Sequence, residues 1–348
     1  MEEHLRQAAE RREVTPSDLD RRIWGEELEW LVPSRVFDVH AHVYRWEFNT
    51  DPDKDRGPLA ETMGRSWPVS DWELLDACDA ALLPGRAVDR LCFGFPFAPS
   101  CDFRASNRFA AAQVAGRRPS RALLLVEPSM TAEALERQID ELGMAGLKPY
   151  RFYSRTGDAV DCRITDFLPE PQIAVADRRG LIVMLHLSRR QGIADPQNLD
   201  DLDRLTERYA HVKWILAHCA RSYAAWAIEQ AGSRLRRWPN VWYDTSSVCE
   251  SDAIEALVQS VGPDRVMYGS DDLPVGVLRG KYIAFGRAWA FLSEKNHSLN
   301  LAHCDPRMTF TRYEQLRAMG RAVRRLGLSR AQVEALFFET ARRLVDSI

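Results

Sequence analysis

The sequence lacks any long apolar run. Apolar residues make up 45% of the 348 residues, but each uninterrupted stretch is much shorter than the ~20 residues that a helix needs to cross a bilayer. The chain opens on Met1-Glu2-Glu3-His4, which is acidic and has no apolar segment behind it. That pattern argues against a secretory signal peptide. We therefore expect neither a membrane span nor a membrane partner.

The sequence also has no excess of positive charge and no paired cysteines. Lysine and arginine number 47 against 50 acidic residues, a net charge of −3. Without a basic excess, nucleic acid is excluded as an expected partner. The seven cysteines are odd in number and contain no CxxC pair. This usage is typical of reduced thiols rather than of a disulfide framework, so we expect a cytoplasmic protein.

Short apolar runs alternate with helical patterns along the chain. The runs are rich in Val, Ile, Leu and Phe, as buried parallel strands are. The predicted strands are residues 36–43, 88–95, 121–126, 145–150, 181–187, 212–217, 240–244 and 265–270. Eight strands alternating with helices predict a (β/α)₈ barrel. A doubly wound sheet is the alternative, but it would not bring the ends of strands one, five, six and eight around one point. We expect residues 1–348 to form a single domain.

Three segments are predicted as additions to this barrel. Residues 1–34 have a helical pattern, with a helix start signal at Thr15-Pro16-Ser17-Asp18. Residues 44–84 and 272–312 follow the first and eighth strands, and both are rich in aromatic and turn residues. These two insertions are expected on the catalytic face, where they would close over its mouth together. The alternative is that their aromatic residues form contacts of a homodimer.

Potential metal ligands end several of the predicted strands. His40 and His42 end the first strand, His186 follows the fifth, His218 the sixth and Asp271 the eighth. Strand ends converge on one face of a barrel, and residues i and i+2 of a strand point the same way. Taken alone, a histidine after an apolar run is more often a core residue than a ligand. Together the residues predict a site for one divalent metal ion, with zinc as the first candidate and manganese or iron as the others.

Substrate contacts are predicted from the same loops. Arg151, Arg189 and Arg221 follow strands four, five and six, and arginine binds carboxylates through two parallel hydrogen bonds. The alternative is that these arginines are solvated loop charges. Ser246, after the seventh strand, is a further candidate for hydrogen bonding to substrate or to His218, and Trp46, in the first insertion, is a candidate for apolar contact.

The ordered motifs of this chain resemble the amidohydrolase superfamily, and most closely the branch that includes aminocarboxymuconate semialdehyde decarboxylase. The motifs are Phe37-Asp38-Val39-His40-Ala41-His42, Gly146-Leu147-Lys148, His186, Ala217-His218-Cys219, Tyr243-Asp244-Thr245-Ser246 and Tyr268-Gly269-Ser270-Asp271. The resemblance covers roughly residues 35–271 and 313–345, and the two insertions match no known member.

This resemblance implies roles for the matching residues. His40, His42, His186 and Asp271 would be metal ligands, with a water molecule completing the shell. His218 would act beside that water as an acid or base, and Asp271 would also take the proton of the water. From its place before Ser246, Asp244 could hydrogen-bond substrate or His218, or it could support the ligands from outside, and Lys148 would also lie outside the ligand set. Lys148 stands near the lysine that bridges two metals in some members, but Lys148-Pro149-Tyr150 is more similar to the branch with one metal.

Three functions remain open at this point. The first is a hydrolase in which metal-activated water attacks a small, carboxylated amide, lactone or ester. The second is a non-oxidative decarboxylase, a carbon–carbon lyase that uses the same metal site. The third is a barrel that serves as a non-catalytic scaffold, and the complete set of potential ligands argues against it. We favour the hydrolase.

Overall fold

Eight parallel strands form the centre of the molecule. The computed structural model describes residues 14–348 except 56–58, 60–62, 65 and 294–300. In sheet order the strands are β1 (Arg35–His42), β4 (Ala87–Phe93), β5 (Arg121–Val126), β6 (Gly146–Pro149), β7 (Ile182–Leu185), β8 (Lys213–Leu216), β9 (Val241–Asp244) and β10 (Val266–Met267). Each of the eight predicted strands is therefore present and in the predicted order.

Backbone hydrogen bonds between the last and first strands close the sheet. The Val39 N–H donates to the Tyr268 carbonyl oxygen over 3.1 Å, and the Asp271 N–H donates to the His40 carbonyl oxygen over 2.9 Å. A further N–H, that of His42, donates to the carbonyl oxygen of Asp272. These bonds continue the ladder beyond the two residues of β10, and they confirm the predicted (β/α)₈ barrel.

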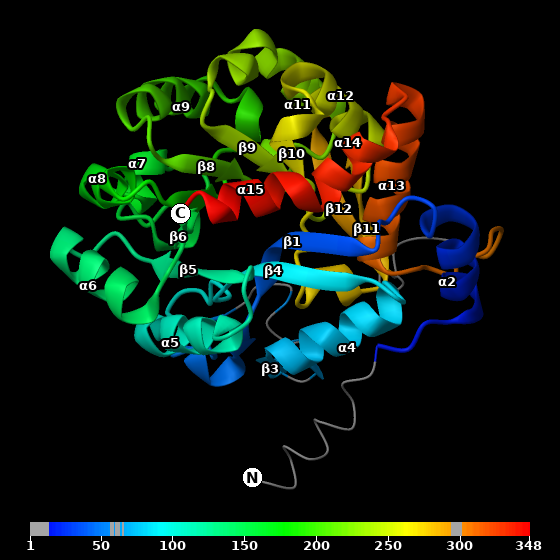
Figure 1. Ribbon diagram of the computed structural model, residues 1–348, viewed down its shortest axis with the longest axis horizontal. Helices are drawn as coiled ribbons and strands as arrows, with labels where there is room; N and C mark the ends of the chain where they lie inside the picture. Colours follow the sequence, from blue (N-terminus) through cyan, green and yellow to red (C-terminus); the bar gives the residue numbers. More distant parts are fainter. Residues whose placement is uncertain (1–13, 56–58, 60–62, 65, 294–300) are drawn as a thin grey trace, which may run out of the picture.

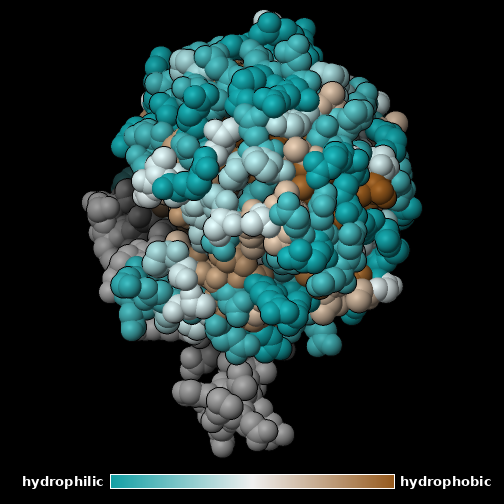
Figure 2. Space-filling model, turned by 90° about the vertical axis from the view of Figure 1, so that its left-hand side faces the viewer, coloured by the Kyte–Doolittle hydropathy of each residue, from teal (hydrophilic) through white to brown (hydrophobic). Residues whose placement is uncertain are grey.

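Helices surround the barrel on its outside (Figure 1). They are α4 (Trp72–Leu82), α5 (Phe103–Val114), α6 (Ala132–Leu142), α7 (Ile164–Phe167), α8 (Glu170–Arg178), α9 (Pro196–Arg208), α11 (Ala225–Ala231), α12 (Ser251–Val261) and α13 (Thr311–Leu326). Several begin at side-chain caps, as α6 does where Thr131 accepts from the Ala134 N–H. The face of the molecule shown in Figure 2 is mostly hydrophilic. No helix in the described part of the chain is both long and apolar enough to cross a membrane.

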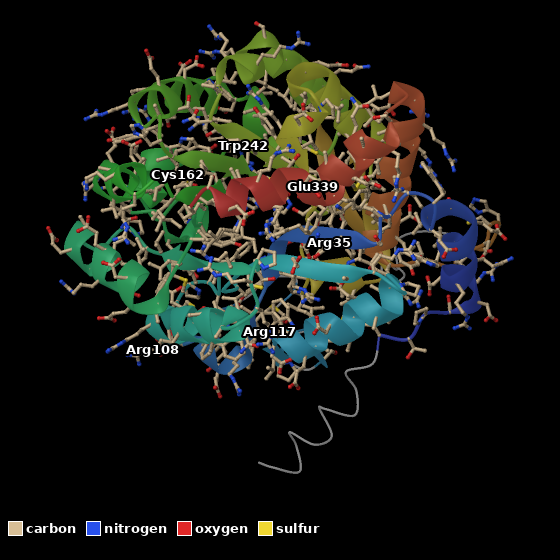
Figure 3. The ribbon with its side chains drawn as sticks, in the orientation of Figure 1. Arg35, Arg108, Arg117, Cys162, Trp242 and Glu339 are labelled. Carbon is tan, nitrogen blue, oxygen red and sulfur yellow. The ribbon has the colours of Figure 1, made fainter. Side chains whose placement is uncertain are left out.

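The C-terminal segment covers the N-terminal end of the barrel. It comprises α14 (Arg330–Glu334), η8 (Ala335–Glu339) and α15 (Thr340–Asp346), and α15 crosses in front of the strands in Figure 1. Phe338 and Leu344 of this segment pack with Phe37 inside the barrel, and the Arg35 guanidinium lies 3.9 Å above the Phe338 ring. Figure 3 labels Arg35 and Glu339 at this end. Because the N-terminal end of the barrel is covered, the opposite end, where the strands terminate, is the one available for a functional site.

The N-terminal extension begins with the helix start that the sequence predicts. The Ser17 hydroxyl accepts from the Asp20 N–H over 3.3 Å, and the Asp20 carboxylate accepts from the Ser17 N–H over 2.7 Å. This reciprocal capping box starts α2 (Asp18–Ile23), which continues into η1 (Trp24–Leu28). Residues 1–13 of the predicted extension lie outside the described residues.

Asp20 also ties this extension to the insertion after the eighth strand. Its carboxylate is buried and accepts from Arg279 Nη2 over 2.7 Å and from the Thr309 hydroxyl over 2.6 Å. Arg279 and Thr309 stand on the two sides of the insertion's base, where the Gly280 N–H donates to the Thr309 carbonyl oxygen over 3.0 Å. One buried carboxylate therefore holds both stems of the insertion.

Replacing Asp20 by alanine is expected to lower the free energy of unfolding by about 1–3 kcal/mol, because the partly buried Arg279 loses its ion-pair partner and the buried Thr309 hydroxyl loses its acceptor. Asp18→Ala is the matched control, since Asp18 lies on the same helix with its side chain 92% exposed. Urea unfolding followed by circular dichroism measures both variants. Equal stability of the two would show that the buried contacts contribute nothing.

The two insertions are shorter than their predicted ranges, because their last residues belong to barrel helices. In 44–84 the final residues form α4, and the preceding part contains β2 (Tyr44–Arg45), η2 (Trp46–Phe48) and β3 (Val69–Ser70). The insertion 272–312 contains η7 (Val275–Val277) and an antiparallel hairpin of β11 (Gly280–Phe285) and β12 (Ala288–Ser293). Residues 56–58, 60–62, 65 and 294–300 of these ranges lie outside the described residues.

The insertions pack on different loops of the barrel. Trp46 of the first insertion lies with its ring centroid 5.6 Å from that of Phe97, in the loop after β4. Trp289 of the hairpin lies 5.2 Å from Tyr223, in the loop after β8. Joint closure of the two insertions over the mouth therefore stays a prediction.

Candidate metal centre

The structure brings the five predicted metal-site side chains together at the C-terminal end of the barrel. His40 and His42 end β1, while His186 follows β7 and His218 follows β8. Asp271 follows β10 and is held beside β1 by its backbone bond to His40. The ring centroids of His40 and His218 are 5.0 Å apart, and those of His186 and His218 are 5.1 Å apart.

One oxygen of Asp271 faces two imidazoles. Asp271 Oδ1 lies 3.4 Å from Nε2 of His40 and 3.4 Å from Nε2 of His42. Among the described residues, His40, His218 and Asp271 each place one potential ligand atom within 4.8 Å of those of the other two. This triad includes His218, whereas the resemblance gives His218 a role beside the ion.

Each of the four histidines is anchored through Nδ1. His40 Nδ1 lies 3.0 Å from the Asp244 carboxylate, and His42 Nδ1 lies 3.4 Å from a backbone carbonyl oxygen. The other two contact carbonyl oxygens in the same way, His186 that of Leu187 over 3.1 Å and His218 that of Ser246 over 3.0 Å. Since a neutral imidazole has one N–H and one lone pair, donation from Nδ1 leaves the lone pair on Nε2.

Burial favours the neutral form of His40, His42 and His186. It lowers the pKa of His40 to about 4, with the charge of Lys148 acting in the same direction and Asp244 opposing it. Burial also lowers the pKa of His42, and it lowers the pKa of His186 well below the usual value. Neutral imidazole is the form that ligates metal ions.

The Asp271 carboxyl is ionised in the same setting. Burial alone would raise its pKa, but the neighbouring imidazoles, first that of His42 and then those of His40 and His218, hold the pKa below its ordinary value. The second carboxylate oxygen, Oδ2, accepts from the Ser247 hydroxyl over 2.6 Å. Asp271 is therefore an oriented anion at neutral pH.

This donor set fits a divalent cation. Nδ1 of His40 and Nδ1 of His42 donate to other groups, so the Nε2 atom of each ring carries a lone pair. These two lone pairs and the Asp271 carboxylate oxygen face one another within hydrogen-bonding range, with no proton between them. Such an arrangement of acceptors is repulsive unless a cation lies among them. Mixed nitrogen and oxygen ligands of this kind suit zinc, manganese or iron.

Asp244 organises the site from behind, as the sequence predicts for a supporting residue. Its carboxylate is fully buried and accepts from His40 Nδ1 and from the backbone N–H groups of His218 and Ser246, each over 3.0 Å. Burial would raise its pKa, but its contacts with His40 lower the pKa overall. A carboxylate behind an imidazole fixes the ring and its tautomer.

Lys148 is buried within the same end of the barrel. Its Nζ has no hydrogen-bond partner in the described part of the chain and lies 4.6 Å from the ring centroid of Phe93 and 4.9 Å from that of Tyr150. Burial lowers the pKa of Lys148 to about 7, against the opposing charges of Asp244 and Asp271. The amine is therefore divided between its two protonation states near neutral pH.

Left-handed backbone is concentrated around this site. Among the described residues, the non-glycine positions with positive φ follow β7, β8, β9 and β10, and they are Arg189, His218, Cys219, Ala220, Arg221, Ser247 and Asp271. Four of them are consecutive and form α10 (Ala217–Arg221), which is a left-handed turn after its first residue. Non-glycine residues adopt this conformation at a cost of about 1–2 kcal/mol each. Strain of this kind is typical of functional sites.

The three predicted arginines differ in their surroundings. Arg189 is engaged away from the site, with Nε 2.7 Å from the Asp195 carboxylate and Nη1 donating to the Asp161 carbonyl oxygen over 2.8 Å. Arg151 and Arg221 have no ion-pair partner among the described residues, and each donates to a backbone carbonyl oxygen. Burial lowers the pKa of Arg151 to about 10, and the charge of Arg221 contributes.

Two other predicted substrate contacts lie in less open positions. Ser246 is fully buried, and its hydroxyl donates to Asp244 and lies 2.9 Å from His218 Nδ1. Trp46 packs on Phe97 within the first insertion. Their roles in substrate binding stay predictions.

Two residues at this site were not assigned these roles from the sequence. Ser247 orients Asp271, although the serine pair after β9 indicates only that a hydroxyl is near the site. Tyr223 lies with its ring 6.3 Å from that of His218 at an interplanar angle of 19°. The sequence indicates that Tyr223 is near the site only through its place three residues after Ala220, in the loop that follows β8.

Solved structures similar to this chain share its fold. An amidohydrolase from Burkholderia multivorans with bound HEPES is 16% identical with a TM-score of 0.58, covering 89% of this chain and 99% of that one. A putative 2-pyrone-4,6-dicarboxylic acid hydrolase from Pseudomonas putida is 18% identical with a TM-score of 0.55, covering 90% and 98%. A dihydroxybenzoic acid decarboxylase from Polaromonas sp. JS666 with bound manganese is 15% identical with a TM-score of 0.54, covering 90% and 96%.

The family comparison covers most of the chain. No curated protein matches this chain. The family described as Amidohydrolase matches residues 37–346, from β1 to the end of α15 and through the hairpin insertion. This match confirms the resemblance drawn from the ordered motifs and indicates an enzyme of the metal-dependent hydrolase or carboxy-lyase type. With a closed barrel, imidazole and carboxylate ligands at its C-terminal end and this match, the chain belongs to the amidohydrolase family.

Proposed function

We propose that this protein is a metal-dependent hydrolase that acts on a small carboxylated amide, lactone or ester. The observation that carries the proposal is the convergence of His40 Nε2, His42 Nε2 and Asp271 Oδ1, three acceptors fixed from behind by other groups. The putative 2-pyrone-4,6-dicarboxylic acid hydrolase among the structural neighbours is consistent with a substrate of this class.

One divalent ion would be held by His40, His42, His186 and Asp271. Zinc is our first candidate, and the manganese of the Polaromonas neighbour keeps that ion as an alternative. When bound, such an ion lowers the pKa of water towards about 7 and polarises a substrate carbonyl.

The residues of the chain would supply the proton transfers. Asp271 is anionic and oriented by Ser247, so it can accept a proton from water at its carboxylate. His218 is adjacent, with its Nδ1 bound to Ser246, and its Nε2 can take up that proton from Asp271 and pass it to the leaving group. Positioned acids and bases of this kind contribute about 10²–10⁴-fold to rate.

Arg151 and Arg221 would bind the substrate carboxylate. Each guanidinium lies close enough to His186 to influence its pKa, and neither has an acidic partner among the described residues. Two neighbouring cations without an anion provide a favourable position for a carboxylate.

A second candidate is a non-oxidative carboxy-lyase, and Lys148 is the observation that favours it. Decarboxylation requires an acid that delivers a proton to carbon, whereas Asp271 is ionised and burial favours the neutral form of His40, His42 and His186. Lys148, with a pKa of about 7, is the group near the site that carries a proton in part of the molecules at neutral pH.

The two functions are separated by their products. Purified, zinc-loaded protein would be incubated with carboxylated lactones, carboxylated anilides and hydroxybenzoates in water enriched in ¹⁸O. Hydrolysis incorporates ¹⁸O into a new carboxylate without releasing CO₂, whereas the lyase releases CO₂. Release of CO₂ from a hydroxybenzoate, abolished in Lys148→Met, would overturn the hydrolase proposal.

His218→Ala is expected to retain the metal ion while kcat falls at least about a hundredfold, because His218 is proposed to transfer protons rather than to ligate. His211→Ala is the control, since that side chain is 79% exposed. Elemental analysis and steady-state kinetics are measured on the same samples. Loss of metal from His218→Ala would make His218 a ligand, as its place in the triad with His40 and Asp271 allows.

A further inference from the structure

The β11–β12 hairpin reaches from its anchored base to the loop that carries His218. Its base is fixed by Asp20 and by the Thr311 hydroxyl, which donates to the Gly280 carbonyl oxygen over 3.2 Å. Further along the hairpin, the Arg287 guanidinium lies 5.0 Å from the ring centroid of Trp226, in α11. The hairpin is therefore attached both to its own base and to the segment that follows β8.

Aromatic rings connect the hairpin to the catalytic histidine. Tyr223 is 8% exposed, and its ring centroid lies 5.0 Å from that of Tyr282 and 5.2 Å from that of Trp289. Its ring is also close to parallel with that of His218. Tyr223 therefore lies between the hairpin and His218.

Trp289 also contacts the predicted substrate arginine. The Arg221 guanidinium lies 5.3 Å from the Trp289 ring centroid, within the range of a cation–π interaction. Arg221 Nη1 donates to the Arg189 carbonyl oxygen. A guanidinium above an indole ring can still donate its remaining N–H groups to a carboxylate.

The turn that carries His218 and Arg221 requires support from its surroundings. Residues 218–221 are all left-handed and none is glycine, so the turn is unfavourable in isolation. On one side it is packed against Gly192, where an added Cβ would lie 2.5 Å from the Arg221 carbonyl oxygen. The hairpin provides packing from another side, through Tyr223 and Trp289.

We propose that the β11–β12 hairpin contributes to carboxylate recognition through Trp289, a positioning residue that holds the Arg221 guanidinium ready to bind a small carboxylate. The proposal rests on the proposed function for its site, but it concerns the recognition of the carboxylate rather than the bond that is broken.

The test measures carboxylate binding as well as turnover. Benzoate affinity of the metal-loaded protein is determined by calorimetry, with benzamide as the uncharged probe, for Trp289→Leu, Trp289→Phe and Phe285→Ala. Leucine keeps apolar packing without an aromatic face, phenylalanine keeps the face, and Phe285 lies on the same hairpin at 56% exposure. Metal content and thermal unfolding establish that each variant is intact.

Trp289→Leu is expected to weaken benzoate binding about tenfold, the loss corresponding to a desolvated cation–π interaction. Trp289→Phe should stay within about threefold of the original protein, Phe285→Ala should be unchanged, and benzamide should not distinguish the variants. Equal benzoate affinity in Trp289→Leu, or no benzoate binding by the unaltered protein, would overturn the inference. If the variants show the expected benzoate affinities but the protein hydrolyses no substrate, only the proposed hydrolase function is refuted.

Discussion

Asp271→Ala is expected to lose both its metal ion and its activity, with turnover reduced at least about 10⁴-fold. The side chain has two proposed functions, because Oδ1 would ligate the ion together with His40 and His42, and the carboxylate would accept the proton of water. Removing it leaves imidazole lone pairs without the anion that balances a divalent charge. Loss of a positioned base alone costs up to about 10⁴-fold, and loss of the ion adds to that cost.

The experiment compares Asp271→Ala with the corresponding His40, His42 and His186 variants and with Asp264→Ala, which replaces an acidic residue in η6 (Pro263–Arg265), outside the site. Elemental analysis gives metal per chain, and circular dichroism confirms that the barrel is folded. Full metal occupancy in both His186→Ala and Asp271→Ala would show that the proposed ligand set is wrong.

Arg312→Met is expected to destabilise the folded protein by about 3–5 kcal/mol, because it leaves a buried carboxylate without its counter-ion. Arg312 lies near the start of α13 and is 1% exposed. Its guanidinium pairs with Asp79 over 2.5 Å and also with Asp272. Asp79 retains a second partner in Arg90, whereas Asp272 has no other ion pair among the described residues.

Arg325→Met provides the matched comparison on the same helix. Its side chain is 60% exposed and pairs with Glu255 over 2.9 Å, an arrangement worth at most about 1 kcal/mol. Guanidinium chloride unfolding at fixed metal concentration yields both values. If the two variants lose similar stability, the buried network does not hold α13 to the barrel in the way that its geometry indicates.

The strands, and the end of the barrel at which the site lies, were predictable from local sequence patterns. Apolar runs ending in His40, His186, His218 and Asp271 define strands and their ends, and a barrel places those ends together whatever the details of packing. The start of α2 at Ser17 was predictable for the same reason, because capping depends on neighbours in sequence.

Features that depend on tertiary contacts were not predictable. The left-handed turn at 218–221 contradicts the backbone preference of each of its residues, so only packing against Gly192 and Tyr223 explains it. The buried pair of Arg312 and Asp79 contradicts the general tendency of charged side chains to face water. The hairpin strands at 280–293 are predicted only as part of an insertion, because their side chains do not alternate between apolar and polar.

The closing seam of the barrel has a consequence for synthesis on the ribosome. The backbone bonds between β1 and the segment after β10 join the first and last strands, and the proposed ligands His40, His42 and Asp271 stand on the two sides of that seam. A nascent chain that has emerged only as far as β9 has seven of the eight barrel strands but only part of the proposed ligand set. Metal acquisition would therefore follow completion of the barrel, and a nascent chain arrested before Asp271 should not retain the ion.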